Sequence, residues 1–171
     1  MVLTKDELIA SLQNEVRILL HLASKLDPTM LDYRPTPKQR TPLELLRYLA
    51  VMGPSLIRGA KIGAFDMEFW QSETEKANAA SVERVLEMIA AQSAEYERLL
   101  NQFSDADFRA EIEMFGRKQS RGSFIVNLVL SGCAAYRTQL FLYLKSCGRE
   151  ELSTMNLWGG IDAPAPAAQT V

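Results

Sequence analysis

The sequence predicts an all-α protein, an up-down-down-up four-helix bundle with a short β-hairpin before its last long helix. Two observations carry this prediction. Apolar residues recur at three-to-four spacing in four long segments, and strands do not alternate with helices. The composition, 47% hydrophobic and 23% charged over 171 residues, is that of one globular domain. We expect the bundle to span residues 1–150 and a tail with a flexible end to span 151–171.

The first two helices have strong start signals. Thr4 and Glu7 fit a capping box, in which each side chain accepts from a free backbone amide of the first turn. Thr41 and Glu44 form a second box, with Pro42 at the first helical position. The first helix should end before Pro28, and the second should fade near residues 59–63.

The middle of the chain is less regular. Residues 31–40 hold two prolines without a helical period, which predicts an extended linker. Gly53-Pro54 falls inside the second helix and should kink it. Residues 64–79 are ambiguous, and we expect a loop with a short helix covering one end of the core. Ser81 should cap the third helix.

A hairpin and a long helix complete the predicted bundle. Apolar and charged residues alternate from Phe108 to Met114 before Gly116, which favours a hairpin over residues 108–119. The fourth helix should run from the N-cap Ser120 to Cys147 and end at Gly148. It is apolar on most sides, so we expect it to be buried or to join two subunits as a homodimer.

Charge and cysteine content limit the classes of function. The net charge of −2 disfavours nucleic-acid binding, which depends on phosphate neutralisation. No apolar run approaches the ~20 residues of a transmembrane helix, so we expect no membrane partner. Cys133 and Cys147 would lie ~21 Å apart on one helix, too far for a disulfide. A reducing, cytoplasmic location follows as an expectation.

Three stretches together resemble the DinB-like (DinB/YfiT) family of four-helix bundles. Residues 31–50, LDYRPTPKQRTPLELLRYLA, are similar to that family's Tyr-Arg-Pro linker and second helix. Residues 135–145, AYRTQLFLYLK, are similar to its fourth helix, which commonly reads His-Arg-Gly-Gln-Leu. Residues 156–164, NLWGGIDAP, are similar to the Asn-Leu-Trp tail of some members. The resemblance therefore covers nearly the whole chain.

The resemblance also implies where a metal ion would bind. In metal-binding members, one histidine of the second helix and two histidines, four residues apart in the fourth, hold a divalent ion. The matching positions here are Tyr48, Gly132 and Tyr136, and the single histidine of the chain is His21. We therefore expect no metal site, and a chain that has lost the family's usual ligands.

Two interpretations of the vacated centre stay open. In the first, Tyr48 and Tyr136 fill it and hydrogen-bond to each other or to a water. In the second, a small pocket partly lined by Gly132 and Met52 still accepts a ligand. Arg137, which follows Tyr136, is either half of a buried salt bridge to Glu15 or Glu44, or a binder of carboxylate or phosphate. The candidate ligand-binding residues are Tyr48, Met52, Gly132, Tyr136 and Arg137.

These observations leave two functional hypotheses. The first is a metal-free bundle that binds a small molecule or acts as an interaction module, without a cofactor. The second, which rests on the resemblance, is a transferase or isomerase that uses a thiol such as mycothiol, bacillithiol or glutathione at a non-metal active site. The sequence names neither the substrate nor a catalytic residue.

Overall fold

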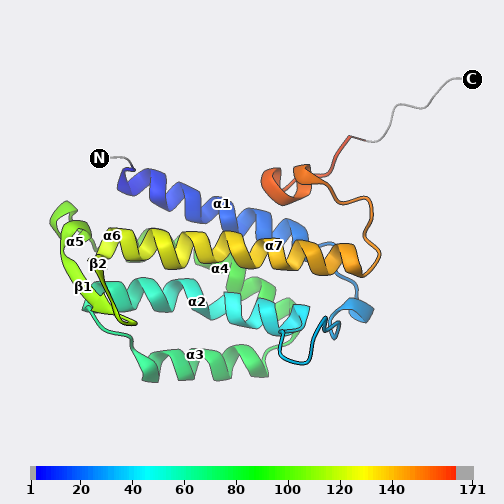
Figure 1. The fold of residues 1–171 in the computed structure, drawn as a ribbon, viewed down its shortest axis with the longest axis horizontal. Coiled ribbons are helices and arrows are strands. Elements are labelled where there is room, and N and C mark those ends of the chain that lie inside the picture. Colours follow the sequence, from blue (N-terminus) through cyan, green and yellow to red (C-terminus); the bar gives the residue numbers. More distant parts are fainter. Residues whose placement is uncertain (1–2, 165–171) are drawn as a thin grey trace, which may run out of the picture.

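The computed structural model describes residues 3–164, and Figure 1 shows a bundle of long helices. The first and last long helices run in one direction and the two between them run in the other, which confirms the up-down-down-up arrangement. The last helix is continuous but has three parts. The elements are α1 (Lys5–Ala23), α2 (Pro42–Ile62), α4 (Val82–Leu100), and α6 (Arg121–Phe124), η2 (Ile125–Leu130) and α7 (Ser131–Ser146) in succession.

The predicted start signals are confirmed. Thr4 and Glu7 form the capping box of α1, and Thr41 and Glu44 form that of α2. In each box, the side chain of either residue accepts from the backbone amide of the other. A short 3-10 turn, η1 (Pro28–Met30), follows the end of α1.

Gly53 and Pro54 lie inside an unbroken α2, next to a buried tyrosine of α4. A Cβ on residue 53 would overlap the Tyr96 hydroxyl, so only glycine permits this approach. The same hydroxyl donates to Gln92 Oε1 over 3.1 Å, and Gln92 Nε2 donates to the Leu49 carbonyl over 2.8 Å. Buried polar groups therefore fasten α4 to the middle of α2.

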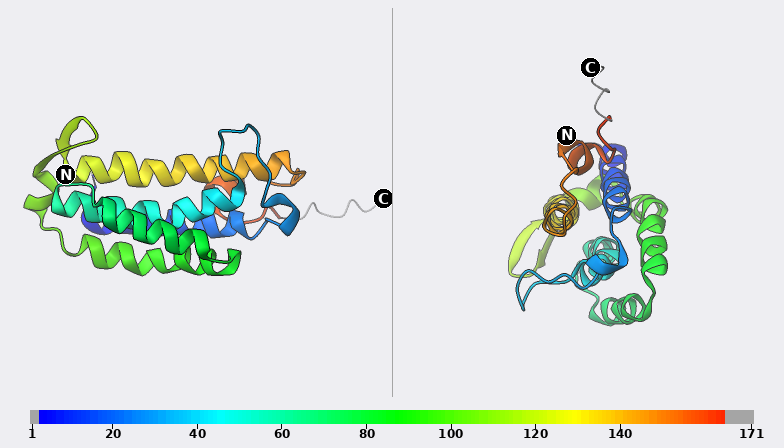
Figure 2. Two further views of the ribbon diagram at one scale, coloured as in Figure 1. Left: turned by 90° about the horizontal axis from the view of Figure 1, so that it is seen from below. Right: turned by 90° about the vertical axis from the view of Figure 1, so that its right-hand side faces the viewer.

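Residues 67–79 correct the sequence-based expectation of a loop with a short helix. They form α3 (Met67–Ala79), which Asp66 caps by accepting from the Phe69 amide. The helix packs on the outside of α2 and carries the chain back along the bundle (Figure 2), so that α4 runs parallel to α2. Only Ala77 of α3 is fully buried, which explains why its apolar period is too weak to identify from the sequence.

The predicted hairpin is present but shorter. Strands β1 (Glu111–Met114) and β2 (Arg117–Ser120) pair antiparallel, and Ile112 and Met114 are buried as their alternation predicts. The expected start at Phe108 is wrong, because α5 (Asp105–Arg109) is a short helix capped by Ser104. The turn places Phe115 at φ 52° and Gly116 at φ 72°, the combination of a tight hairpin turn.

The last helix contains a π-helical segment that the sequence does not reveal. In η2 the backbone hydrogen bonds join residues five apart in sequence instead of four. The Ser131 hydroxyl also donates to the Val126 carbonyl over 3.0 Å. The helix ends at Gly148, with φ 94°, as predicted. Residues Arg121–Ser146 are long and apolar enough to cross a membrane by length and composition alone, a test that a helix of a bundle core also passes.

The segment after the bundle packs against α1. Its helical turn η3 (Met155–Gly159) is followed by Asp162, which pairs with Lys25 over 2.7 Å. Nδ2 of the Asn156 amide lies 3.1 Å from His21 Nε2 and also donates to Asp162. The end of the tail, which we expected to be flexible, lies outside the described residues.

Stability should depend on the protonation of His21. Burial, and next the charge of Lys25, lower the pKa of His21 below its ordinary value of about 6.5. The unfolded chain therefore takes up the proton first as the pH falls. We expect the free energy of unfolding to be level just above pH 6.5 and to decrease as the pH falls below it. His21→Gln should flatten this slope in urea titrations between pH 5.5 and 7, and an unchanged slope would contradict the assignment.

Candidate functional site

An apolar cavity of about 580 Å³ lies between α2, α3, the last helix and the hairpin tip. Four of the five predicted site residues, Tyr48, Met52, Gly132 and Tyr136, line it together. We call it the tyrosine cavity; the rest of its wall is mostly apolar and consists of Leu56, Phe65, Trp70, Phe115, Asn127, Leu128, Ser131 and Ala135.

Aromatic rings form the inner wall of the tyrosine cavity. The rings of Tyr48 and Tyr136 meet edge to face, with centroids 5.1 Å apart and planes at 69°. Trp70 lies 5.8 Å from Tyr48 in a similar arrangement. Burial, and next the hydrogen bond with Tyr136, raise the pKa of Tyr48 to about 12. The Tyr48 phenol therefore stays protonated at neutral pH and can orient a ligand, but it is a poor general base.

Gly132 permits close packing of α7 on α2. A Cβ at this position would lie 3.3 Å from Met52 Cε and 3.4 Å from Met52 Sδ. The Met52 thioether thus occupies the space beside the Gly132 backbone.

This group of residues does not fit a divalent metal ion. The lining of the tyrosine cavity offers two phenols, a thioether and a glycine, whereas imidazole, thiolate and carboxylate groups are the usual ligands of such an ion. Within residues 3–164, no three His, Cys, Asp or Glu side chains gather closely enough to hold a metal ion.

Arg137 points away from the tyrosine cavity and does not line it. Its Nε donates to Glu15 Oε2 over 2.7 Å and its Nη2 to Glu15 Oε1 over 3.2 Å. A third donor, Nη1, reaches the Leu157 carbonyl, and Trp158 stacks on the guanidinium at 5.6 Å. Of the two interpretations, the arrangement is that of the buried salt bridge, with Glu15 as the partner.

Cys133 also lies apart from the cavity, although it follows Gly132. Burial raises the pKa of the Cys133 thiol to about 12, and its neighbours are Tyr96 and the Glu15–Arg137 pair. A thiol that holds its proton so firmly is a packing group rather than a nucleophile.

A second cavity, of about 650 Å³, shares Tyr48 and Trp70 with the tyrosine cavity. We call it the basic cavity, because Arg34, Lys38, Arg40, Arg47 and the single carboxylate Glu44 line it. Sequence reasoning missed it, although four basic residues between positions 34 and 47 were a visible signal.

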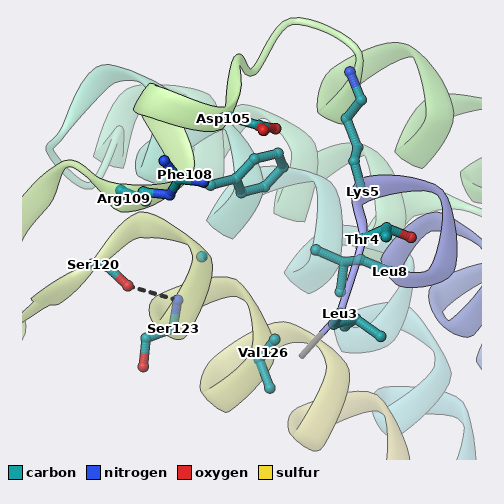
Figure 3. A pocket seen from close by; sticks show the side chains of 11 residues that line it. Leu3, Thr4, Lys5, Leu8, Asp105, Phe108, Arg109, Ser120, Ser123 and Val126 are labelled. Atoms are coloured by element: carbon teal, nitrogen blue, oxygen red, sulfur yellow. Dashed lines mark hydrogen bonds between the residues drawn. The ribbon is translucent and has the colours of Figure 1, made fainter. Parts of the chain in front are cut away.

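A third cavity, of about 560 Å³, opens at the end of the bundle where α1 begins (Figure 3). Leu3, Leu8, Phe108 and Val126 provide its apolar surface. Lys5, Asp105 and Arg109 stand among its polar groups, and Ser120 at its edge already accepts from the Ser123 amide as a helix cap. It lies at the far end of the last helix from Tyr136 and contains none of the predicted site residues.

Comparison with known proteins identifies the family and the fold. The family model described as the DinB superfamily matches residues 11–131. The chain is similar to the crystal structure of a DinB-like protein from Bacillus subtilis, with a TM-score of 0.65 and 16% identity. The match covers 85% of this chain and 94% of that one, and at this identity it shows the fold alone. A search of curated proteins finds no match.

The Glu15–Arg137 pair should contribute strongly to stability. The Arg137 side chain is 4% exposed and that of Glu15 is 12% exposed, so the loss of one partner leaves a buried charge without compensation. We expect Glu15→Gln to lower the free energy of unfolding by about 3 kcal/mol in urea titrations. The double variant Glu15→Gln, Arg137→Met should recover part of that loss. A single variant as stable as the native protein would contradict the role assigned to the pair.

Proposed function

We propose that this chain, which belongs to the DinB superfamily, binds a small molecule in the tyrosine cavity and does so without a metal ion. One observation carries the proposal. The three positions where the family resemblance expects histidines are Tyr48, Gly132 and Tyr136, and they still face a cavity of ligand size.

The lining of the tyrosine cavity indicates an apolar ligand, preferably one that contains an aromatic ring. Tyr48, Trp70 and Tyr136 offer ring faces and edges, and Phe115 closes one side from the hairpin tip with its ring 5.4 Å from Phe65. Aromatic pairs of this geometry gain about 0.5–1.5 kcal/mol beyond the burial of their area. The phenol hydroxyls and Asn127 are the polar groups that could orient the guest.

Binding is favoured over catalysis by the chemistry of the lining. The lining contains no His, Cys, Asp, Glu, Lys or Arg side chain, and burial raises the pKa of Tyr48 to about 12. The alternative, a thiol-dependent transferase or isomerase, would require the thiol cofactor to supply the nucleophile. A thermal-shift panel of glutathione, bacillithiol and mycothiol separates the two hypotheses. If the alternative holds, a thiol at 100 times its Kd should raise the free energy of unfolding by about 2.7 kcal/mol. Our proposal expects no shift.

We further propose that the chain works in the cytoplasm as a homodimer. The free cysteines Cys133 and Cys147 suit a reducing compartment. No charged residue lies between Arg121 and Arg137, and Leu142 further along the same helix is 55% exposed. Two copies could pair along this helix without opposing like charges, each burying the same surface of the other.

Filling the tyrosine cavity should abolish binding. Ala135 lines it from an exposed position on α7, so Ala135→Phe can add a ring without entering the core. We expect 2-naphthylmethanol to bind the native protein in isothermal titration calorimetry and its affinity for the variant to fall at least tenfold. Ala94→Phe, at an exposed position of α4, is the matched control and should bind normally. Unchanged affinity for the Ala135→Phe protein would overturn the site.

The dimer proposal has a separate test. Leu142→Glu places a charge on the proposed contact, and we expect sedimentation velocity at micromolar concentration to show a monomer. Ile62→Glu is the control, since Ile62 is also 55% exposed but lies on α2, and it should remain a dimer. A native protein that sediments as a monomer would refute the proposal. The Ala135→Phe protein is measured alongside, so that lost binding is not confused with lost pairing.

A further inference from the structure

The basic cavity indicates a charge on the ligand. We propose that the ligand is an organic anion whose apolar body lies in the tyrosine cavity and whose acidic group lies in the basic cavity. This inference rests on the proposed function and specifies the class of ligand. The two cavities adjoin at Tyr48 and Trp70, which line both, and the proposed ligand extends across these two rings.

The basic cavity has an excess of positive charge that no described residue neutralises. Its carboxylate, Glu44, already accepts from Arg34 over 2.7 Å and from the Thr41 amide over 2.9 Å. These hydrogen bonds hold the pKa of Glu44 below its ordinary range. The carboxylate is therefore ionised and is already bound to Arg34 and the Thr41 amide. Within residues 3–164, Lys38, Arg40 and Arg47 form no ion pair. A concave surface with uncompensated cations attracts an anion.

Two buried donors in the lining lack an acceptor. Arg47 Nε on α2 and Thr74 Oγ1 on α3 are shielded from solvent and make no hydrogen bond to the described protein. A second nitrogen of Arg47 donates to the Ala80 carbonyl over 2.9 Å, which fixes the guanidinium in place. Buried donors are nearly always satisfied in folded proteins, so these two require a partner from outside the chain. An acidic group offers several acceptor atoms, and charged hydrogen bonds are the stronger kind.

Arg40 brings a positive charge next to Tyr48, which lines both the basic cavity and the tyrosine cavity. Its guanidinium lies over the Tyr48 ring at 4.0 Å from the centroid, while the Tyr48 ring meets Tyr136 inside the tyrosine cavity. A stacked guanidinium presents its N–H groups at its edge, the geometry that suits a planar carboxylate or a phosphate. An anion held by Arg40 and Arg47 would therefore sit directly beside the apolar site.

A matched pair of probes tests the inference. Calorimetry at low salt compares 2-naphthoate with 2-naphthylmethanol, which share the ring system and differ in charge. We expect the native protein to bind the acid at least tenfold more tightly, and high salt to reduce this preference. Arg40→Gln and Arg47→Gln should each weaken binding of the acid about tenfold more than binding of the alcohol, the effect of one lost charged hydrogen bond. Arg98→Gln, in an exposed pair with Glu95 on α4, should alter neither.

The outcomes separate the two proposals. Equal affinities for acid and alcohol overturn the inference and leave the proposed function standing. If both arginine variants still bind the acid more tightly than the alcohol by the native factor, the inference is also overturned, because other residues then recognise the charge. If neither probe binds the native protein, the proposed function fails and the inference fails with it. Should Arg47→Gln fail to fold, the exposed Arg40→Gln decides alone.

Discussion

The buried pair of Arg137 and Glu15 sets how the last helix faces the rest of the bundle. The guanidinium ties α7 to α1 and, through the Leu157 carbonyl, to the segment that follows the bundle. Successive residues of a helix point about 100° apart, so an Arg137 held against α1 turns Tyr136 toward α2. Gly132 is one turn earlier on the same face as Tyr136. The salt bridge thereby places the tyrosine cavity without taking part in it.

The centre of the bundle combines close aromatic packing with an adjacent cavity. Tyr48 and Tyr136 pack edge to face and form one wall of the tyrosine cavity. Gly132 contributes no side chain, and the end of the Met52 side chain lies beside its backbone. The flexible thioether adapts to such an irregular space. What remains is apolar and about 580 Å³ in volume.

Helix α3 explains why half of the candidate site escaped sequence reasoning. Trp70 and Thr74 lie on it, and they line the tyrosine cavity and the basic cavity from outside the four-helix core. A helix that buries little of itself has a weak apolar period, so its length could not be identified and its contacts could not be anticipated. The π-helical turn of η2 has no periodic signature in the sequence either.

The sequence by itself determined the all-α class, four amphipathic helices of the bundle, the capped starts at Thr4 and Thr41, and the alternation of Ile112 and Met114 in the hairpin. It also placed Tyr48, Gly132 and Tyr136 at the positions where the family resemblance implies histidines. These features are local, because spacing, capping and residue identity depend only on residues close together in the sequence. Only the tertiary structure decided that Arg137 pairs with Glu15 and turns away from the cavity, and that Arg47 and Thr74 line one cavity. Such contacts join residues distant in sequence, and their geometry depends on how whole helices pack.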